Sequence, residues 1–162
     1  MRVQADADQL PSAPPLAVED LWTEHYARLV DLAAAMVGSR ARGEELVQDA
    51  FAKVLKRYDT IANPGGYIRT TVVNGAKSEL RKREVRRRLG RTAADPATVD
   101  ADDEYLTDAL HRLSPNRRIA IVLRYYADLS DEQIGEHLGV RPATVRSLLA
   151  RGIADLREVF DR

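Results

Sequence analysis

The sequence contains no cysteine, only two methionines and few aromatic residues, which make up 6% of its 162 residues. The absence of cysteine excludes disulfides, thiolate metal sites and cysteine nucleophiles, and it fits a reducing compartment. Long apolar runs are also absent: the longest, Leu32 to Val37, has six residues, whereas a membrane-spanning helix needs about 20. The amino-terminal segment lacks the basic-then-apolar order of a secretory signal. These absences favour a cytoplasmic protein that does not act at a membrane.

Signals of catalytic chemistry are missing as well. The three histidines, His25, His111 and His137, are scattered and have no partner at metal-ligand spacing. The pair Gly65-Gly66 is not followed by the lysine and hydroxyl residue of a phosphate-binding loop. Serine and aspartate residues do not form a nucleophile elbow. We therefore expect no catalytic residue, no metal site and no cofactor, and a protein that is not an enzyme.

The charge is balanced in total but strongly segregated along the chain. Lys and Arg together number 25, as do Asp and Glu, so the net charge is zero. Residues 67–91 nevertheless hold nine basic and two acidic residues, whereas residues 92–108 hold six acidic residues and no basic one. This segregation indicates that one surface of the protein can meet a polyanion.

The periodicity of apolar residues predicts an all-α protein. Apolar residues recur at three- and four-residue steps over 18–37, 40–58 and 66–88, and again from Leu106 onwards. Asn63 and Ser114 each precede a proline, which is typical of a helix start. Residues 90–103 are acidic and poor in apolar side chains, and we interpret them as a linker. The pattern predicts a loose tail over 1–17 and two small helical domains, 18–89 and 104–162. In the second helix, one buried stripe is expected to hold Leu46, Val47, Ala50, Phe51, Val54, Leu55 and Tyr58.

Residues 130–151 have the pattern of a helix-turn-helix. Ser130 and Gln133 form a predicted capping box at the start of its first helix. Gly139 would make the turn, and Gly135 would be the small residue at the point where the two helices cross. Pro142 would open the second helix. The apolar plugs would be Ile134, Leu138, Val140, Val145 and Leu148.

The second helix of this motif presents side chains suited to DNA. Its exposed positions would be Arg141, Ala143, Thr144, Arg146, Ser147 and Arg151. Such side chains contact phosphates and base edges in a major groove. A plain helical hairpin, which matches some of these positions, is the alternative. The full set of matches together favours a DNA-reading helix.

A basic helical segment, residues 77–91, is the second candidate for a nucleic-acid contact. Its basic residues surround the helix, so they repel one another unless a polyanion neutralises them. Upstream of them, Tyr67, Asn74 and Ser78 are suited to stack on, or hydrogen bond to, an unpaired base. The alternative interpretation is a solvated charged face.

These motifs, in this order and spacing, resemble the extracytoplasmic-function (group IV) bacterial sigma factors of the sigma-70 superfamily. The resemblance spans about residues 18–160. The run Glu45 to Phe51 resembles the stretch that binds core polymerase, and Tyr67 to Arg83 resembles the segment that binds the −10 element. Residues 113–126 resemble the run before the helix-turn-helix, and residues 130–151 resemble the motif that reads the −35 element. The first domain is thus similar to sigma region 2 and the second to sigma region 4.

The resemblance implies a function and a set of contact residues. The protein would bind core RNA polymerase as a monomer, read the −35 duplex with its second domain, and capture flipped-out −10 bases with its first. The acidic linker would thread through the polymerase channel, and an anti-sigma factor is a further candidate partner. The implied core-binding residues are Glu45, Leu46, Gln48, Asp49 and Phe51. The implied −10 contacts are Tyr67, Arg69, Asn74, Lys77, Ser78, Arg81, Lys82 and Arg83. The implied −35 contacts are Arg141, Thr144, Arg146, Ser147 and Arg151, with Arg146 as a base reader and Arg151 as a phosphate clamp.

Two alternatives remain open at this point. A free-standing helix-turn-helix regulator would bind duplex DNA without polymerase, but it would leave the Glu45–Phe51 helix and the basic segment unexplained. Leu46 and Phe51 would, in the simplest view, only fill the domain core.

The sequence also departs from the family where Leu148 stands in place of a common arginine. Gly152 replaces a common alanine, and we expect it to weaken its helix by roughly 0.5–1 kcal/mol.

Overall fold

The structure, a computed structural model, describes residues 15–91 and 104–161, and every regular element within those ranges is helical. The prediction of an all-α fold is therefore confirmed. The predicted linker lies almost wholly outside the described residues. The helices are α1 (Pro15–Val37), α2 (Arg40–Lys56), α3 (Pro64–Arg88), α4 (Glu104–Arg112), α5 (Pro115–Tyr125), α6 (Asp131–Leu138) and α7 (Pro142–Phe160), with a short 3-10 turn at Tyr58–Thr60 between α2 and α3.

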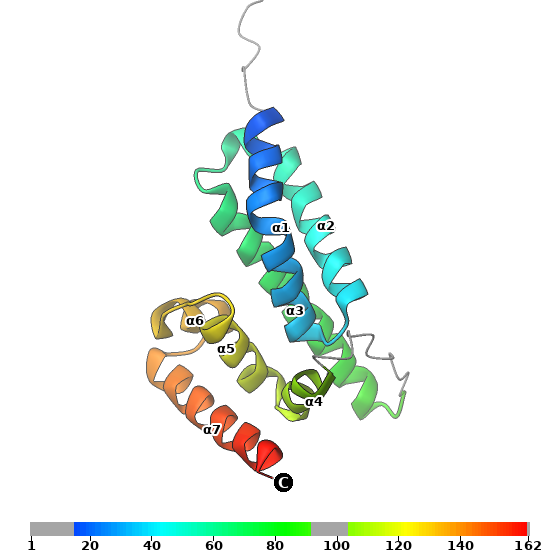
Figure 1. Cartoon of the computed structure of the whole chain (residues 1–162), viewed down its shortest axis with the longest axis vertical. Coiled ribbons are helices and arrows are strands. Elements are labelled where there is room, and N and C mark those ends of the chain that lie inside the picture. The colour runs from blue at the N-terminus through cyan, green and yellow to red at the C-terminus, as the bar shows by residue number, and fades with distance from the viewer. Residues whose placement is uncertain (1–14, 92–103, 162) are drawn as a thin grey trace, which may run out of the picture.

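Helices α1, α2 and α3 lie side by side and form the first unit (Figure 1). Their apolar residues meet in one core that includes the fully buried Met36, Val47 and Ile68. Asn63 caps α3 as expected, since its side chain accepts a hydrogen bond from the Gly66 amide at 2.9 Å. Helix α1 begins at Pro15, three residues before the predicted start, which is consistent with the tolerance for proline in a first helical turn.

One expectation for α2 is wrong. Leu55, placed in the buried stripe by its spacing, is 53% exposed. The apolar residues of α2 that face the core are Val47, Ala50, Phe51 and Val54, which are almost completely buried. The apolar stripe of α2 is therefore narrower than the sequence pattern, and one large apolar side chain remains on the surface.

The second unit is built around α5, with α6 and α7 packed against it (Figure 1). The predicted capping box is present: the Ser130 side chain accepts from the Gln133 amide, and the Gln133 side chain accepts from the Ser130 amide. Gly139 adopts the left-handed conformation with φ of 67°. A Cβ at Gly135 would stand 2.6 Å from the Val140 carbonyl oxygen, so only glycine permits this crossing. The helix-turn-helix geometry is confirmed.

Two details of the second unit differ from the sequence analysis. Ser114 occupies the position before α5, but its side chain makes no capping hydrogen bond. Gly152, expected only to weaken α7, is buried against α5, where an added Cβ would lie 2.7 Å from Ile121 Cδ1. This glycine therefore allows α7 to approach α5 closely.

The two units also pack against each other. Helix α5 contacts α1 and α3, and α6 contacts α3. Helix α7 lies on the outer side of the second unit, away from α1 to α3 (Figure 1). The sequence predicted two domains joined by a linker but gave no indication of this contact between them.

Candidate nucleic-acid interface

Helix α7 presents one line of exposed polar side chains. Thr144, Ser147 and Arg151 follow one another at i, i+3 and i+7 and therefore share a face. Arg141 occupies the N-cap position of the helix and is also exposed. Within 15–91 and 104–161, neither Arg141 nor Arg151 has an ion-pair partner. The amino-terminal end of α7 is thus a free cationic surface of the kind that binds a duplex backbone.

Arg146 lies on the flank of this surface, beside α6. Its Nη1 atom is 3.4 Å from Asp131 Oδ2, and its side chain is 63% exposed. Asp131 accepts a second hydrogen bond, from Arg124 of α5, on its other oxygen. The carboxylate therefore keeps a cationic partner if Arg146 moves away towards a ligand.

Helix α3 gathers four of the predicted −10 residues on one face. Asn74, Lys77, Ser78 and Arg81 occupy positions i, i+3, i+4 and i+7. Arg81 and the neighbouring Lys82 are exposed, whereas Tyr67, one further helical repeat towards the amino terminus, is half-buried against the core. Arg69 and Arg83 lie outside this line of positions.

Arg83 belongs to a network of ion pairs rather than to the exposed basic face. It donates to the Val37 carbonyl at the end of α1, and its Nε lies 3.5 Å from Glu79 Oε1. Glu79 also accepts from Arg42 at 2.8 Å. Burial alone would raise the pKa of Glu79, but the hydrogen bond and charge of Arg42, with Arg83 and Arg86, lower it.

Glu84 has the same role in the next turn of α3. Arg87 and Arg88 both donate to its carboxylate, at 2.9 and 3.2 Å, and they lower its pKa. The expectation that the basic residues of this segment repel without acidic neighbours is therefore wrong. Two glutamates neutralise some of its charge. The exposed basic residues that do not bind these two carboxylates are Arg81, Lys82, Arg86 and Arg91.

Helix α6 contacts this face of α3 at Lys77, which is half-buried, whereas Asn74 is exposed. Lys77 Nζ donates to the His137 carbonyl in the last turn of α6. Burial lowers the pKa of Lys77, and the nearby charge of Arg81 lowers it further. A cavity of about 370 Å³ separates the two helices beside this contact, and among its lining residues are Arg69 and Asn74 from α3 and Gln133 and Glu136 from α6.

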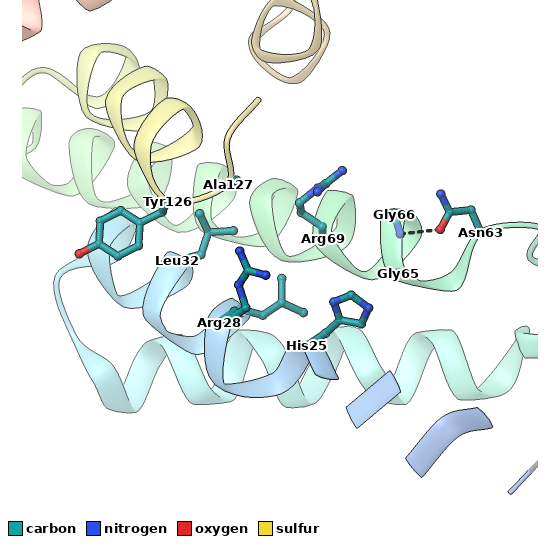
Figure 2. Close-up of a pocket in the computed structure, with 10 residues that line it drawn as sticks. His25, Arg28, Leu32, Asn63, Gly65, Gly66, Arg69, Tyr126 and Ala127 are labelled. Atoms are coloured by element: carbon teal, nitrogen blue, oxygen red, sulfur yellow. Dashed lines mark hydrogen bonds between the residues drawn. The ribbon is translucent and has the colours of Figure 1, made fainter. Parts of the chain in front are cut away.

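A second cavity, of about 380 Å³, brings His25 and Arg28, which the sequence did not assign to any site, together with the predicted −10 residue Arg69 (Figure 2). His25 and Arg28 reach it from α1, and Arg69 reaches it from α3. The amino terminus of α3, with Gly65 and Gly66, forms one wall. Among the described residues, no acidic side chain lines this cavity, and Arg69 Nε is buried there without a hydrogen-bond partner. The spacing of His25 and Arg28, at i and i+3 on an amphipathic helix, was the available signal.

The predicted polymerase-binding residues are divided between the surface and the core. Gln48 and Asp49 are exposed, and Glu45 is exposed but bound to Arg42. Phe51 is 2% exposed, its ring centroid 4.7 Å from that of Trp22. Leu46 is half-buried. The exposed Leu55, which follows Gln48 at i+7, shares its face and was missed because the pattern placed it in the core.

Two further observations bear on other classes of protein. Within 15–91 and 104–161, no three histidine, aspartate or glutamate side chains are placed to hold a metal ion. No helix in those ranges is long and apolar enough to cross a membrane.

Comparison with known proteins identifies both units. The family model described as Sigma-70 region 2 matches residues 21–88, and that described as Sigma-70, region 4 matches residues 103–156. RNA polymerase sigma factor CarQ of Myxococcus xanthus is 34% identical over 155 residues, which cover 89% of each chain. RNA polymerase sigma-E factor of Streptomyces coelicolor is 31% identical over 153 residues, which cover 86% of each chain.

A solved structure is similar across both units. It contains the sigma factor RpoE in complex with the anti-sigma factor NepR from Bartonella quintana. The match has 25% sequence identity and a TM-score of 0.67, and it covers 88% of this chain and 98% of that chain. The resemblance found in the sequence is confirmed: this chain belongs to the extracytoplasmic-function group of the sigma-70 family, whose members bind core RNA polymerase and direct transcription initiation at promoters.

Proposed function

We propose that α7 reads the −35 element through Arg141, Thr144, Arg146, Ser147 and Arg151. The observation that carries this assignment is the line of exposed side chains at the amino-terminal end of α7, with two arginines that have no acidic partner in the described ranges. In helix-turn-helix proteins this end of the second helix enters the major groove. Arg146 keeps the role of base reader and Arg151 that of phosphate clamp.

The proposed −10 surface is the face of α3 that carries Asn74, Ser78 and Arg81, together with Lys77 once α6 is displaced. Arg81 and Lys82 are exposed cations for backbone phosphates. Arg83 is reassigned to a structural role because it bonds to Val37 and Glu79. The cationic cavity around His25 and Arg28 adjoins the amino terminus of α3 and extends this basic surface (Figure 2).

The proposed polymerase-docking surface is the exposed side of α2. Gln48 and Asp49 supply its polar contacts, and Leu55 supplies an apolar one. Phe51 supports this surface from below through its contact with Trp22. Core polymerase places the site of action in the cytoplasm, and the anti-sigma complex of the RpoE relative supports an anti-sigma factor as a further partner of this chain.

Binding of the holoenzyme to a promoter mapped from transcript start sites tests the −35 assignment. Loss of a base-edge contact in Arg146→Ala should cost about 1–3 kcal/mol on the mapped −35 sequence and little on a scrambled one. Loss of a phosphate contact in Arg151→Ala should weaken both alike. Arg157→Ala, which removes an exposed arginine from the far end of α7, is the matched control. If no α7 variant changes binding, this helix does not read DNA.

Binding of the chain to core polymerase tests the α2 assignment separately. Gln48→Ala combined with Asp49→Lys should weaken the complex, and Leu55→Ser should do the same without a change of charge. Glu158→Lys on the exposed side of α7 provides the matched charge reversal. Undiminished binding of both α2 variants, with the fold intact, would place the docking surface elsewhere.

A further inference from the structure

Arg146, the proposed base reader, differs from the other arginines of the −35 surface because it has an acidic partner. Its Nη1 atom donates to Asp131 Oδ2, in the first turn of α6, at 3.4 Å. Arg141 and Arg151 have no ion-pair partner in the part of the chain that the structure describes. Within that part, Arg146 is therefore the one −35 arginine whose orientation is restrained by the protein itself.

Asp131 is itself held in place by two other helices. It is the first residue of α6, where the capping box of Ser130 and Gln133 fixes the backbone and the helix dipole favours a carboxylate. Its Oδ1 atom accepts a hydrogen bond from Arg124, near the end of α5. The carboxylate is 20% exposed. Because α5 and α6 fix this group, its second oxygen offers Arg146 a defined contact.

The contact with Asp131 leaves most of the arginine free to bind DNA. A guanidinium carries five N–H donors in one plane, and a single donor is directed at Asp131. Arginine reads guanine by placing two donors on O6 and N7 in the major groove. Such a contact requires one orientation of the plane. A contact to a backbone phosphate carries no sequence information and needs no such restraint.

The pair of Arg146 and Asp131 contributes little to the fold. The Arg146 side chain is mostly exposed, and exposed ion pairs add little to stability. A negative charge beside a DNA-binding surface also repels phosphates, which lowers affinity for every sequence. Restraint of Arg146 before binding has the opposite effect on its target base pair, because less side-chain freedom is then lost in the complex.

We propose that Asp131 determines specificity at the −35 surface by acting through Arg146. Its Oδ2 atom holds the guanidinium in the orientation that reads a guanine, and Arg124 fixes the carboxylate from α5. Asp131 is thus a positioning residue that touches no base itself. Its loss weakens discrimination at one base pair and does not weaken binding overall. This inference rests on the proposed role of Arg146 as a base reader.

The test measures binding of the holoenzyme to promoters in which each base pair of the mapped −35 element is replaced in turn. Arg146→Ala first identifies the position that Arg146 reads, because replacement there no longer lowers affinity. Asp131→Asn keeps the shape of the side chain but removes its charge. It should reduce the affinity penalty at that same position by about two- to tenfold and leave the penalties at other positions unchanged. Combined with Arg146→Ala, it should change no penalty further.

Glu132→Gln is the matched control. Glu132 is the next residue of α6, is exposed, and has no ion-pair partner in the described ranges. Removal of either negative charge should raise affinity for all sequences alike. Only Asp131→Asn should also alter discrimination at the position that Arg146 reads.

The outcomes separate the inference from the proposed function. An unchanged penalty at the Arg146 position in Asp131→Asn, with the fold intact by circular dichroism, would overturn the inference. Equal relaxation at every position, or the same effect in Glu132→Gln, would also overturn it. If Asp131→Asn fails to fold, Asp131→Ser removes the same contact, and an unchanged penalty there has the same meaning. If Arg146→Ala relaxes no position, the proposed function of Arg146 is wrong and the inference falls with it.

Discussion

Helices α3 and α7 carry similar basic side chains but differ in how available those side chains are. On α7, Arg141 and Arg151 are exposed and have no acidic partner in the described ranges. On α3, Arg83, Arg87 and Arg88 bind glutamates of their own helix, and Lys77 binds a carbonyl of α6. The density of basic residues in the sequence therefore overstates the number of cations that α3 presents to DNA.

The comparison also separates two kinds of DNA contact. Helix α7 lies at the outside of the protein, so a duplex can reach it in the packed arrangement (Figure 1). Helix α3 contacts both α1 and α6, and on its polar face Lys77 is engaged by α6 while Asn74, Ser78 and Arg81 are exposed. The proposed −35 surface is therefore open in the packed arrangement, whereas the proposed −10 surface has one of its cations, Lys77, bound to α6.

The largest expected effect on stability comes from removal of the buried Arg118 guanidinium, which joins the two units. Arg118→Ala leaves the carbonyls of Met36 and Leu113 without a donor in a buried site, and it removes one of the two donors to the Leu110 carbonyl. We expect the free energy of unfolding to fall by about 3–5 kcal/mol, measured by urea denaturation. Arg117→Ala is the matched control, since Arg117 makes a half-exposed pair with Asp155 that should contribute less than about 1 kcal/mol. Equal losses in both variants would refute the role of Arg118.

The salt dependence of DNA binding tests whether the exposed cations of α3 contribute more than its ion-paired cations. Arg81→Gln with Lys82→Gln removes two exposed cations, and the slope of log affinity against log salt should fall by roughly 1.4–1.8. Arg87→Gln with Arg88→Gln removes two cations that bind Glu84, so the slope should change less. The measurement is holoenzyme binding to promoter DNA between low and moderate salt. Equal changes for both pairs would mean that the ion pairs do not limit availability.

The pH dependence of stability tests the burial of the His111 imidazole against Gly38. Burial lowers the pKa of His111 from 6.5 to about 4, and the nearby charges of Arg118 and Arg83 add to this effect while Asp108 opposes it. Because the folded chain holds the imidazole neutral, this contribution to stability is complete above pH 6.5 and falls as the pH is lowered towards 4.

At pH 5 the loss of stability from protonation of His111 should amount to about 1 kcal/mol. This figure is reduced to allow for solvent screening, because the imidazole is partly exposed. The free energy of unfolding, measured by urea denaturation, should therefore decrease from pH 7.5 to 5. His111→Gln should remove most of that dependence. His137 contributes in the same direction, because burial and then the charges of Arg69 and Lys77 lower its pKa, against Glu136. An unchanged pH profile in His111→Gln would assign the effect to other groups.

Local patterns were sufficient to predict the elements and the motif. Asn63, Ser130, Gly135 and Gly139 act through neighbours within a few residues, so their spacing alone indicated the caps, the crossing and the turn. The outward residues of α7 followed from the same periodicity.

Contacts between distant segments could not be predicted in this way. Arg42 meets Glu79 across 37 positions, and Arg118 meets Met36 across 82. Nothing in the local sequence of Arg83 distinguishes it from the exposed Arg81. Leu55 has the spacing of a core residue, and only the packing of the helices shows that its side chain lies on the surface. Which cations of the site are free is therefore a property of the tertiary structure.

The smallest expected effect concerns the contact of α7 with α5 at Gly152. By helix propensity alone, Gly152→Ala should stabilise α7 by about 0.5–1 kcal/mol. The added Cβ would, however, lie 2.7 Å from Ile121 Cδ1 and 3.5 Å from Arg117 Cβ. Because the end of the Ile121 side chain can shift only partly in a packed core, we expect the overlap to offset the gain, with a net change within about 0.5 kcal/mol.

A double-mutant cycle with Ile121→Val separates the two contributions, because valine lacks the Cδ1 atom that the new methyl group meets. Ile121→Val alone should destabilise the chain by roughly 0.5–1.5 kcal/mol. In that background Gly152→Ala should become stabilising, which gives a favourable coupling of about 0.5–1 kcal/mol in urea denaturation. Additive effects would show that α7 does not owe its close approach to α5 to this glycine. The proposed −35 surface would then be positioned by the turn at Gly139 and the buried contact of Val145.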